Sequence, residues 1–322
     1  MSVKTDLWLI GAGQMAMDYA MVLDSLKIEY DVIGRGKTSA VQFEANCNQK
    51  VKVGGVDYWL RQEGIHTPKF AIVAVGIEDL ASTTINLLKC GVKNILVEKP
   101  AGVNSVEINQ LAKETKNKNA RVFVAYNRRF YSSTIKAKKI IKNDGGVSSF
   151  HFDFTEWLHL VEETKVSIKV KNYWFIANSS HVVDLAFYLC GKPDKISYYT
   201  AGSLDWHPAA SVFAGAGITK NNVLFTYNAN WGAPGRWGVE IMTNKHRLIL
   251  RPLEKLQIQK HGSIEINYIN DIDYSLDEDY KPGLFLQTSN FLNLNNESMI
   301  DIKQFNSMIR VYNKMTNYHI KN

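Results

Sequence analysis

Short apolar runs alternate with helical patterns over roughly the first 120 residues. The runs are apolar nearly throughout and comprise residues 7–10, 30–33, 70–76 and 95–98. Such runs predict short strands that are buried on both faces of a sheet. Between the last two, apolar positions at helical spacing predict a helix over residues 79–90, with Gly91 as its stop. Strands that alternate with helices favour right-handed βαβ crossovers and a parallel sheet.

The pattern changes after about residue 122, where segments rich in β-branched and aromatic residues follow one another. The segments that we expect to be strands are residues 149–156, 195–201, 222–231, 236–243 and 246–251. Because strands here follow strands, an antiparallel sheet is expected. A last helix is predicted near residues 303–316. The chain is therefore predicted to be α/β, with a parallel sheet in a domain of residues 1–122 and a largely antiparallel sheet in a second domain, residues 123–322.

A glycine motif follows the first strand directly and opens the first helix. It reads Gly11-Ala12-Gly13-Gln14-Met15-Ala16, a G-x-G-x-x-A in the strand–turn–helix context that dinucleotide-binding sites require. Gly11 permits the tight turn, Gly13 lets the backbone approach a pyrophosphate, and Ala16 keeps helix and strand close. The first N–H groups of the helix then face the phosphates. The sequence predicts a dinucleotide site at Gly11–Met15, and an ordinary glycine turn is the alternative.

The end of the second strand carries basic and hydroxyl residues in place of an acid. NAD sites usually place Asp or Glu here, where it binds the ribose 2′-hydroxyl. A carboxylate would repel a 2′-phosphate, whereas a guanidinium binds one through charge-assisted hydrogen bonds. Asp31 lies at the start of the strand, too far back for this role. We therefore expect NADP(H) to be favoured over NAD(H), with a solvated basic loop as the alternative. The expected contacts are Arg35, Lys37, Thr38 and Ser39.

Residues 95–100 read Ile-Leu-Val-Glu-Lys-Pro, an apolar run that ends in an acid, a base and a proline. Pro100 cannot donate to a strand ladder, so the strand is expected to stop there. Lys99 is therefore predicted at the carboxyl end of a strand, the edge of an open α/β sheet where ligands bind. A surface lysine in a strand-end turn is the alternative.

These features together resemble the Gfo/Idh/MocA oxidoreductases, the family of glucose–fructose oxidoreductase and inositol dehydrogenase. Order and spacing fit that family over at least residues 5–191. The matching pieces are Gly11–Ala16, Glu98-Lys99-Pro100-Ala101-Gly102, Ala125-Tyr126-Asn127-Arg128-Arg129-Phe130, Ser180-His181-Val182-Val183-Asp184-Leu185, and Tyr188-Leu189-Cys190-Gly191. The resemblance implies an N-terminal Rossmann domain that binds NAD(P) and a C-terminal α/β domain with an open, largely antiparallel sheet, which binds substrate and forms a homodimer or homotetramer.

The resemblance also implies the reaction, hydride transfer between a nicotinamide and a hydroxyl or ketone of a sugar or sugar derivative. Lys99 would hydrogen-bond the reacting oxygen and His181 would exchange its proton, with a capping or core histidine as the alternative. Further cofactor contacts are expected at Val75, Gly76, Glu98 and Lys99. The expected substrate contacts are Tyr126, Asn127, Arg128, Arg129, Asn178 and Asp184, and burial in an ion pair is the alternative for either arginine.

One departure from the family bears on the substrate. Many members carry Asp four residues before the histidine, but this chain has Ala177, with Asn178 beside it. The role of the missing acid would pass to Asn178 and Asp184, or the substrate differs. A reductase of a non-sugar substrate and a catalytically silent NAD(P)-binding sensor of the same fold remain alternatives. The segment 231–237 is expected to be a loop over the active site with aromatic faces for a sugar ring, or an ordinary hairpin loop.

Composition excludes several other classes of protein. The net charge is +7, but the basic residues are dispersed and no nucleic-acid-binding motif is present. The charge instead suits anionic ligands, namely the cofactor's phosphates and, as an open alternative, an anionic sugar derivative. No apolar run approaches the ~20 residues of a membrane span, and no signal-peptide pattern precedes the first strand. Cys47, Cys90 and Cys190 are isolated and lack metal-site spacing. We expect a cytoplasmic protein without a metal, a nucleic-acid partner or a membrane partner.

Overall fold

The computed structural model describes residues 5–62 and 66–318. The chain divides into two compact units, the first comprising Met1–Tyr126 with Asp279–Met308 and the second Asn127–Glu278 with Ile309–Asn322. The second domain expected from the sequence, residues 123–322, is therefore not one continuous segment of a single unit. The physical reason is an edge strand: Ile300 pairs antiparallel with Val124, which brings a distant part of the chain into the first unit.

The first unit is built on a seven-stranded sheet in the order β15-β6-β5-β4-β1-β2-β3. All neighbours in it are parallel except β15 and β6, which confirms the predicted parallel sheet. The strands are β1 (Leu7–Ile10), β2 (Asp31–Gly34), β3 (Val51–Val53), β4 (Phe70–Val73), β5 (Asn94–Glu98), β6 (Arg121–Ala125) and β15 (Ile300–Asp301). The strand order reverses between β1 and β4, and that point is where open α/β sheets bind ligands.

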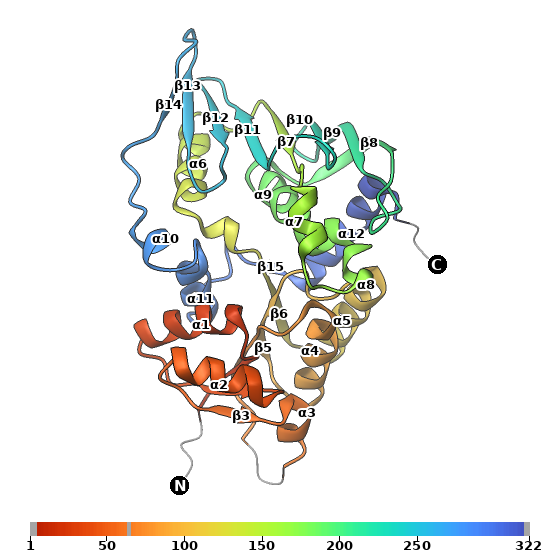
Figure 1. Cartoon of the computed structure of the whole chain (residues 1–322). Helices are drawn as coiled ribbons and strands as arrows, with labels where there is room; N and C mark the ends of the chain where they lie inside the picture. The colour runs from red at the N-terminus through yellow and green to blue at the C-terminus, as the bar shows by residue number, and fades with distance from the viewer. Residues whose placement is uncertain (1–4, 63–65, 319–322) are drawn as a thin grey trace. The chain divides into compact units, whose positions relative to one another are not determined.

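Helices connect the parallel strands of this unit, as Figure 1 shows for the red to orange part of the chain. They are α1 (Gln14–Ser25), α2 (Lys37–Asn46), α3 (Gly55–Leu60), the short 3₁₀ turn η1 (Ile77–Asp79), α4 (Leu80–Lys89) and α5 (Ser105–Asn117). The unit also contains α11 (Leu284–Leu292), which precedes β15. The helix expected over residues 79–90 is thus confirmed as η1 and α4. Among the described residues, no helix combines the length and the apolar character needed to cross a bilayer.

The second unit is built on an eight-stranded sheet in the order β14-β13-β12-β11-β7-β10-β9-β8. Only β7 and β10 pair in parallel, so the largely antiparallel prediction is confirmed. The strands are β7 (Ser149–Asp153), β8 (Pro193–Ala201), β9 (Val212–Thr219), β10 (Leu224–Asn230), β11 (Gly238–Met242), β12 (His246–Leu250), β13 (Gln257–Lys260) and β14 (Ile266–Tyr268). The helices and turns are η2 (Asn127–Phe130), α6 (Ser132–Asn143), α7 (Leu158–Glu163), α8 (Ile168–Lys171), the π-helical turn η3 (Phe175–Ser179), α9 (Ser180–Cys190) and α10 (Ser275–Asp279). The helix α12 (Ile302–Thr316) belongs to the first unit up to Met308 and to the second from Ile309.

Aromatic packing holds α9 against the middle of this sheet. Phe187 of α9 lies edge-on to Phe152 of β7 at 5.5 Å and to Phe225 of β10 at 5.3 Å between ring centroids. Phe150 stacks on Phe225 at 5.2 Å. Each such pair contributes about 0.5–1.5 kcal/mol beyond its buried area. These contacts fix the C-terminal half of α9 on the sheet, and His181 is the second residue of the same helix.

Candidate active site

The glycine loop between β1 and α1 has the geometry that a dinucleotide needs. Gly11 has φ +120°, and a Cβ there would lie 2.3 Å from the Ala74 carbonyl oxygen, so only glycine fits. At Gly13, the N-cap of α1, a Cβ would meet no described atom within 4 Å. The same holds for Gly76 after β4. The backbone at Gly13 and Gly76 is therefore not covered by side chains, so a pyrophosphate can approach it closely.

A cavity of about 660 Å³ lies over this loop at the point where the strand order reverses. Its predicted lining residues are Gly11, Ala12, Gly13, Gln14, Met15, Arg35, Ser39, Val75 and Gly76. Lys37 and Thr38 are exposed in the first turn of α2 and do not line it. The bare backbone and the size of the cavity fit a dinucleotide.

Arg35 follows β2 directly and its side chain is 83% exposed. Its guanidinium pairs with the Asp79 carboxylate at 3.0 Å, and both residues line the cavity. Exposed pairs of this kind contribute little free energy, so the guanidinium can change partners. Asp31 accepts a hydrogen bond from Thr5 and pairs with Lys52, and it does not line the cavity.

Glu98 and Lys99 lie at the carboxyl end of β5, where the sequence predicted them. The hydroxyl of Tyr19 in α1 donates to the Glu98 carboxylate at 2.7 Å. Burial raises the pKa of Glu98, while that hydrogen bond and the neighbouring Lys99 charge act to lower it. Both residues are half-buried and lie outside the lining of the 660 Å³ cavity. The Glu98 carboxylate therefore anchors the strand end that presents Lys99.

In the second unit, His181 is the second residue of α9 and is buried, with 5% of its surface exposed. Its ring lies 6.2 Å from that of Trp237, centroid to centroid. The turn before it, η3, is π-helical, and single π-turns inside helices are frequent at functional sites.

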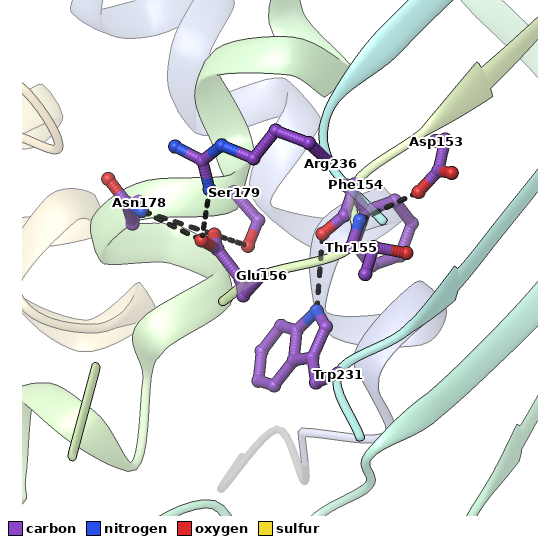
Figure 2. Close-up of polar contacts among 8 residues, drawn as sticks. All are labelled: Asp153, Phe154, Thr155, Glu156, Asn178, Ser179, Trp231 and Arg236. Carbon is purple, nitrogen blue, oxygen red and sulfur yellow. Dashed lines mark hydrogen bonds and ion pairs between the residues drawn. The ribbon is translucent and has the colours of Figure 1, made fainter. Parts of the chain in front are cut away.

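A buried carboxylate that sequence reasoning missed lies beside this turn. Glu156 accepts hydrogen bonds from the Ser179 hydroxyl at 2.6 Å and from the Asn178 amide at 3.1 and 3.2 Å. Arg236 donates to its Oε2 at 3.1 Å (Figure 2). Burial raises the pKa of Glu156, against the opposing effects of Ser179 and Arg236. The carboxylate thus connects the turn that precedes His181 to the segment that follows β10.

Comparisons with known proteins bear on the fold. No protein-family model and no curated protein matches the chain. Solved structures do match over nearly the whole length. Levoglucosan dehydrogenase in complex with NADH and L-sorbose is 15% identical with a TM-score of 0.75, covering 97% of this chain and 95% of its own. The chain therefore has the fold of this dehydrogenase.

Two nucleotide-sugar dehydrogenases have the same fold. UDP-N-acetylglucosamine 3-dehydrogenase GnnA from Acidithiobacillus ferrooxidans is 12% identical with a TM-score of 0.72, and 98% of each chain is covered. The WlbA dehydrogenase from Bordetella pertussis, in complex with NADH and UDP-GlcNAcA, is 14% identical with a TM-score of 0.70, covering 98% of this chain and 96% of its own. At these identities the likeness is one of fold, and it confirms the fold class expected from the sequence.

Of the expected substrate contacts, Arg129 and Asp184 bind each other. Two hydrogen bonds of 2.6 and 2.7 Å join the guanidinium to both carboxylate oxygens. Their side chains are only 10% and 4% exposed. This geometry fits the alternative of a buried ion pair. Tyr126 is likewise packed in the core of the first unit, 5.6 Å from the ring of Phe305, and Asn127 is buried at the start of η2.

The segment 231–237 was expected to be either a loop with aromatic faces for a sugar ring or an ordinary hairpin loop, and it differs in part from both. Trp231 is 1% exposed and donates to the Phe154 carbonyl at 3.2 Å, so its ring belongs to the core and offers no face to a sugar. A hairpin is wrong, because β7 lies between β10 and β11 in the sheet. Trp237, at the other end of the segment, is the aromatic residue that lies beside His181. No group of three or more His, Cys, Asp or Glu residues suited to a metal occurs in the described part of the chain.

Proposed function

We propose that the protein is an NAD(P)-dependent oxidoreductase that transfers a hydride between the nicotinamide and a hydroxyl or ketone carbon of a sugar derivative. The observation that carries the proposal is the cavity at the strand-order reversal, with its bare backbone at Gly13 and Gly76. Levoglucosan dehydrogenase and WlbA, which share the fold, have been solved with NADH and a sugar or sugar nucleotide. That agreement supports the substrate class.

In this proposal Gly11–Met15 hold the pyrophosphate, and Val75 and Gly76 contact the cofactor in the same cavity. Glu98 and Lys99, at the end of β5 outside that lining, complete the cofactor contacts. The cofactor supplies the hydride acceptor or donor. Lys99 hydrogen-bonds the reacting oxygen and polarises it. His181 takes the proton that the hydroxyl loses as the C–H electron pair leaves with its hydrogen as hydride, and returns a proton in the reverse direction. Asn178 and Arg128 position the sugar.

The test is turnover of a panel of neutral and acidic sugars with NADP⁺ or NAD⁺, followed by absorbance of the reduced nicotinamide. Lys99→Ala and His181→Ala should each lower kcat by about 10²–10⁴-fold, and His181→Ala should leave cofactor affinity unchanged. Lys89→Ala and His261→Ala, on exposed positions of the same residue types, are the matched controls. Cofactor binding without turnover of any sugar would reject the sugar oxidoreductase and favour the sensor or a reductase of a non-sugar substrate.

We infer further that NADP(H) is preferred over NAD(H). Support comes from Arg35, which lies at the cavity in an exposed and exchangeable ion pair, and from the lack of an acid at the end of β2. Arg35→Ala should weaken NADP⁺ binding by about tenfold or more and leave NAD⁺ binding unchanged. Asp79→Asn should strengthen NADP⁺ binding, because it removes the competing carboxylate. An unchanged NADP⁺ affinity in Arg35→Ala would show the preference to be wrong, and Lys37→Ala controls for general charge.

A homodimer or homotetramer that pairs the sheets of second units is also proposed. Tyr199 of β8 and Leu224 of β10 point to one face of that sheet and are 72% and 63% exposed, which is unusual for such large apolar groups. The double variant Tyr199→Glu/Leu224→Glu should sediment as a smaller species than the wild type. Equal sedimentation of both proteins as monomers would contradict this arrangement.

The cytoplasm is the proposed compartment. Cys47, Cys90 and Cys190 are all free thiols, which suits a reducing environment. Fractionation of cells that express the tagged protein tests this placement.

A further inference from the structure

Two guanidinium groups from distant parts of the second unit lie over one indole ring. The Cζ atom of Arg128, in η2, is 4.8 Å from the ring centroid of Trp237, and that of Arg236 is 4.4 Å from it. The ring of His181 is 6.2 Å from the same indole. A cation over an aromatic face gains about 0.5–2 kcal/mol, so the indole stabilises both charges at this place.

Arg236 is held in one orientation but keeps donors to spare. One of its terminal nitrogens donates to Glu156 at 3.1 Å, and its guanidinium also lies over the Trp157 ring at 4.8 Å. Its side chain is still 40% exposed. Figure 2 shows the other terminal nitrogen directed away from Glu156. A planar fork fixed on one side in this way is pre-organised for a ligand with two oxygens.

Arg128 has a buried donor that the fold leaves unused. Its Nε is inaccessible to solvent and has no hydrogen-bond acceptor among the described residues. A buried donor without an acceptor costs about 1–3 kcal/mol, and a ligand oxygen that accepted a hydrogen bond from it would offset that cost. Arg236 pairs with one carboxylate, that of Glu156, and the two guanidiniums together carry more positive charge than this carboxylate offsets.

We propose that Arg128 and Arg236 form a receptor for an anionic group of the substrate, a carboxylate or a phosphate, beside His181. This inference rests on the proposed function, because the anion is carried by the sugar that His181 would act on. Trp237 fixes the spacing of the two guanidiniums, and Glu156 fixes the rotation of Arg236. The protein would accordingly select acidic or phosphorylated sugars over neutral ones.

The test measures binding of matched sugars to the full-length protein saturated with NADP⁺, so that phosphate sites for the cofactor are filled. D-glucuronate, D-glucose 6-phosphate and D-glucose are titrated by calorimetry, and the first two distinguish a carboxylate from a phosphate ligand. We expect at least one of the anionic sugars to bind about ten- to a hundredfold more tightly than glucose. Arg236→Met and Arg128→Met should each lower the ratio of anionic-sugar affinity to glucose affinity by about tenfold or more.

Two further variants keep the result interpretable. Arg236→Lys preserves the charge and the fold but loses the planar fork, so an intermediate affinity is expected if the methionine variant is unstable. Arg247→Met removes an arginine that pairs with Glu240 on the sheet and should change nothing. Equal affinity for charged and neutral sugars in the wild type, or anion binding that survives in both methionine variants, would overturn the receptor. Turnover of neutral sugars would in that case still support the proposed function, whereas anion binding without any turnover would support the receptor alone.

Discussion

Breaking the buried pair of Arg129 and Asp184 should destabilise the second unit strongly. Both charged groups are almost fully withdrawn from solvent, and two short hydrogen bonds join them. Removing one partner leaves the other charge buried and uncompensated, which costs about 3–5 kcal/mol. Asp184→Leu and Arg129→Met should each lower the free energy of unfolding by this amount. Together they replace the pair by apolar groups of similar volume, so the double variant should recover most of the loss.

Unfolding in urea, followed by tryptophan fluorescence, measures these changes. Trp8 and Trp59 belong to the first unit and the other five of the seven tryptophans to the second. The fluorescence therefore reports mainly on the second unit, which contains Arg129 and Asp184. The coupling between the two substitutions is the decisive quantity. If the double variant loses the sum of the two single losses, the pair is not a structural unit. If Asp184→Leu costs less than about 1 kcal/mol while raising KM for a sugar, the side chain contacts substrate as the sequence suggested.

Three further predictions concern the glycine loop, a core histidine and the end of β5. Gly13→Val should abolish cofactor binding at near wild-type stability, because a Cβ at this position meets no described atom within 4 Å. Gly11→Ala should lower the melting temperature, because its Cβ would clash with Ala74. Similar melting temperatures of the two variants would contradict this reasoning. Burial lowers the pKa of His207 from 6.5 to about 4, so the imidazole is protonated more readily in the unfolded state. The free energy of unfolding should therefore fall by about 3 kcal/mol between pH 6.5 and pH 4. In His207→Gln, urea unfolding should show no such dependence on pH. Tyr19→Phe removes the hydrogen bond that offsets the effect of burial on the pKa of Glu98, so that pKa should rise further. The free energy of unfolding should fall by about 1–3 kcal/mol at neutral pH. An unchanged free energy of unfolding would show that the bond is unimportant.

The parallel sheet could be predicted from the sequence because its signals are local. Each strand is a short apolar run, and Gly11 must be glycine for reasons within the turn itself. Strand β9 (Val212–Thr219) was not predicted, since its glycines and alanines are poor strand formers. A Cβ at Gly215 would lie 2.5 Å from the Tyr227 ring, and one at Gly217 would lie 2.6 Å from Phe225. The aromatic residues of β10 thus require these glycines, and that requirement depends on strand pairing that no local pattern reveals.

The parallel pairing of β7 with β10 was missed for the same reason. Both strands show the alternation of a half-buried strand, and alternation does not specify a partner or its direction. Because β7 is inserted between β10 and β11, the segment 231–237 crosses the end of β7. That crossing places Trp231 in the core and Trp237 near α9. The composition of the segment could not predict that one tryptophan would be a core residue and the other a neighbour of His181.

The carboxylate near His181 shows where sequence reasoning stopped short. Buried phenylalanines at 150, 152 and 154 predict that position 156 also faces the core, and it is a glutamate. A charge on the buried face of an alternating strand indicates a specific role, since it is stable only with donors around it. Those donors, Asn178, Ser179 and Arg236, come from segments 22, 23 and 80 residues away, which the sequence could not connect. One carboxylate thus connects the turn before His181 to the segment that carries Trp237. Of the two residues expected to replace the missing acid at position 177, Asn178 takes part in this connection as a donor to Glu156, whereas Asp184 is paired with Arg129.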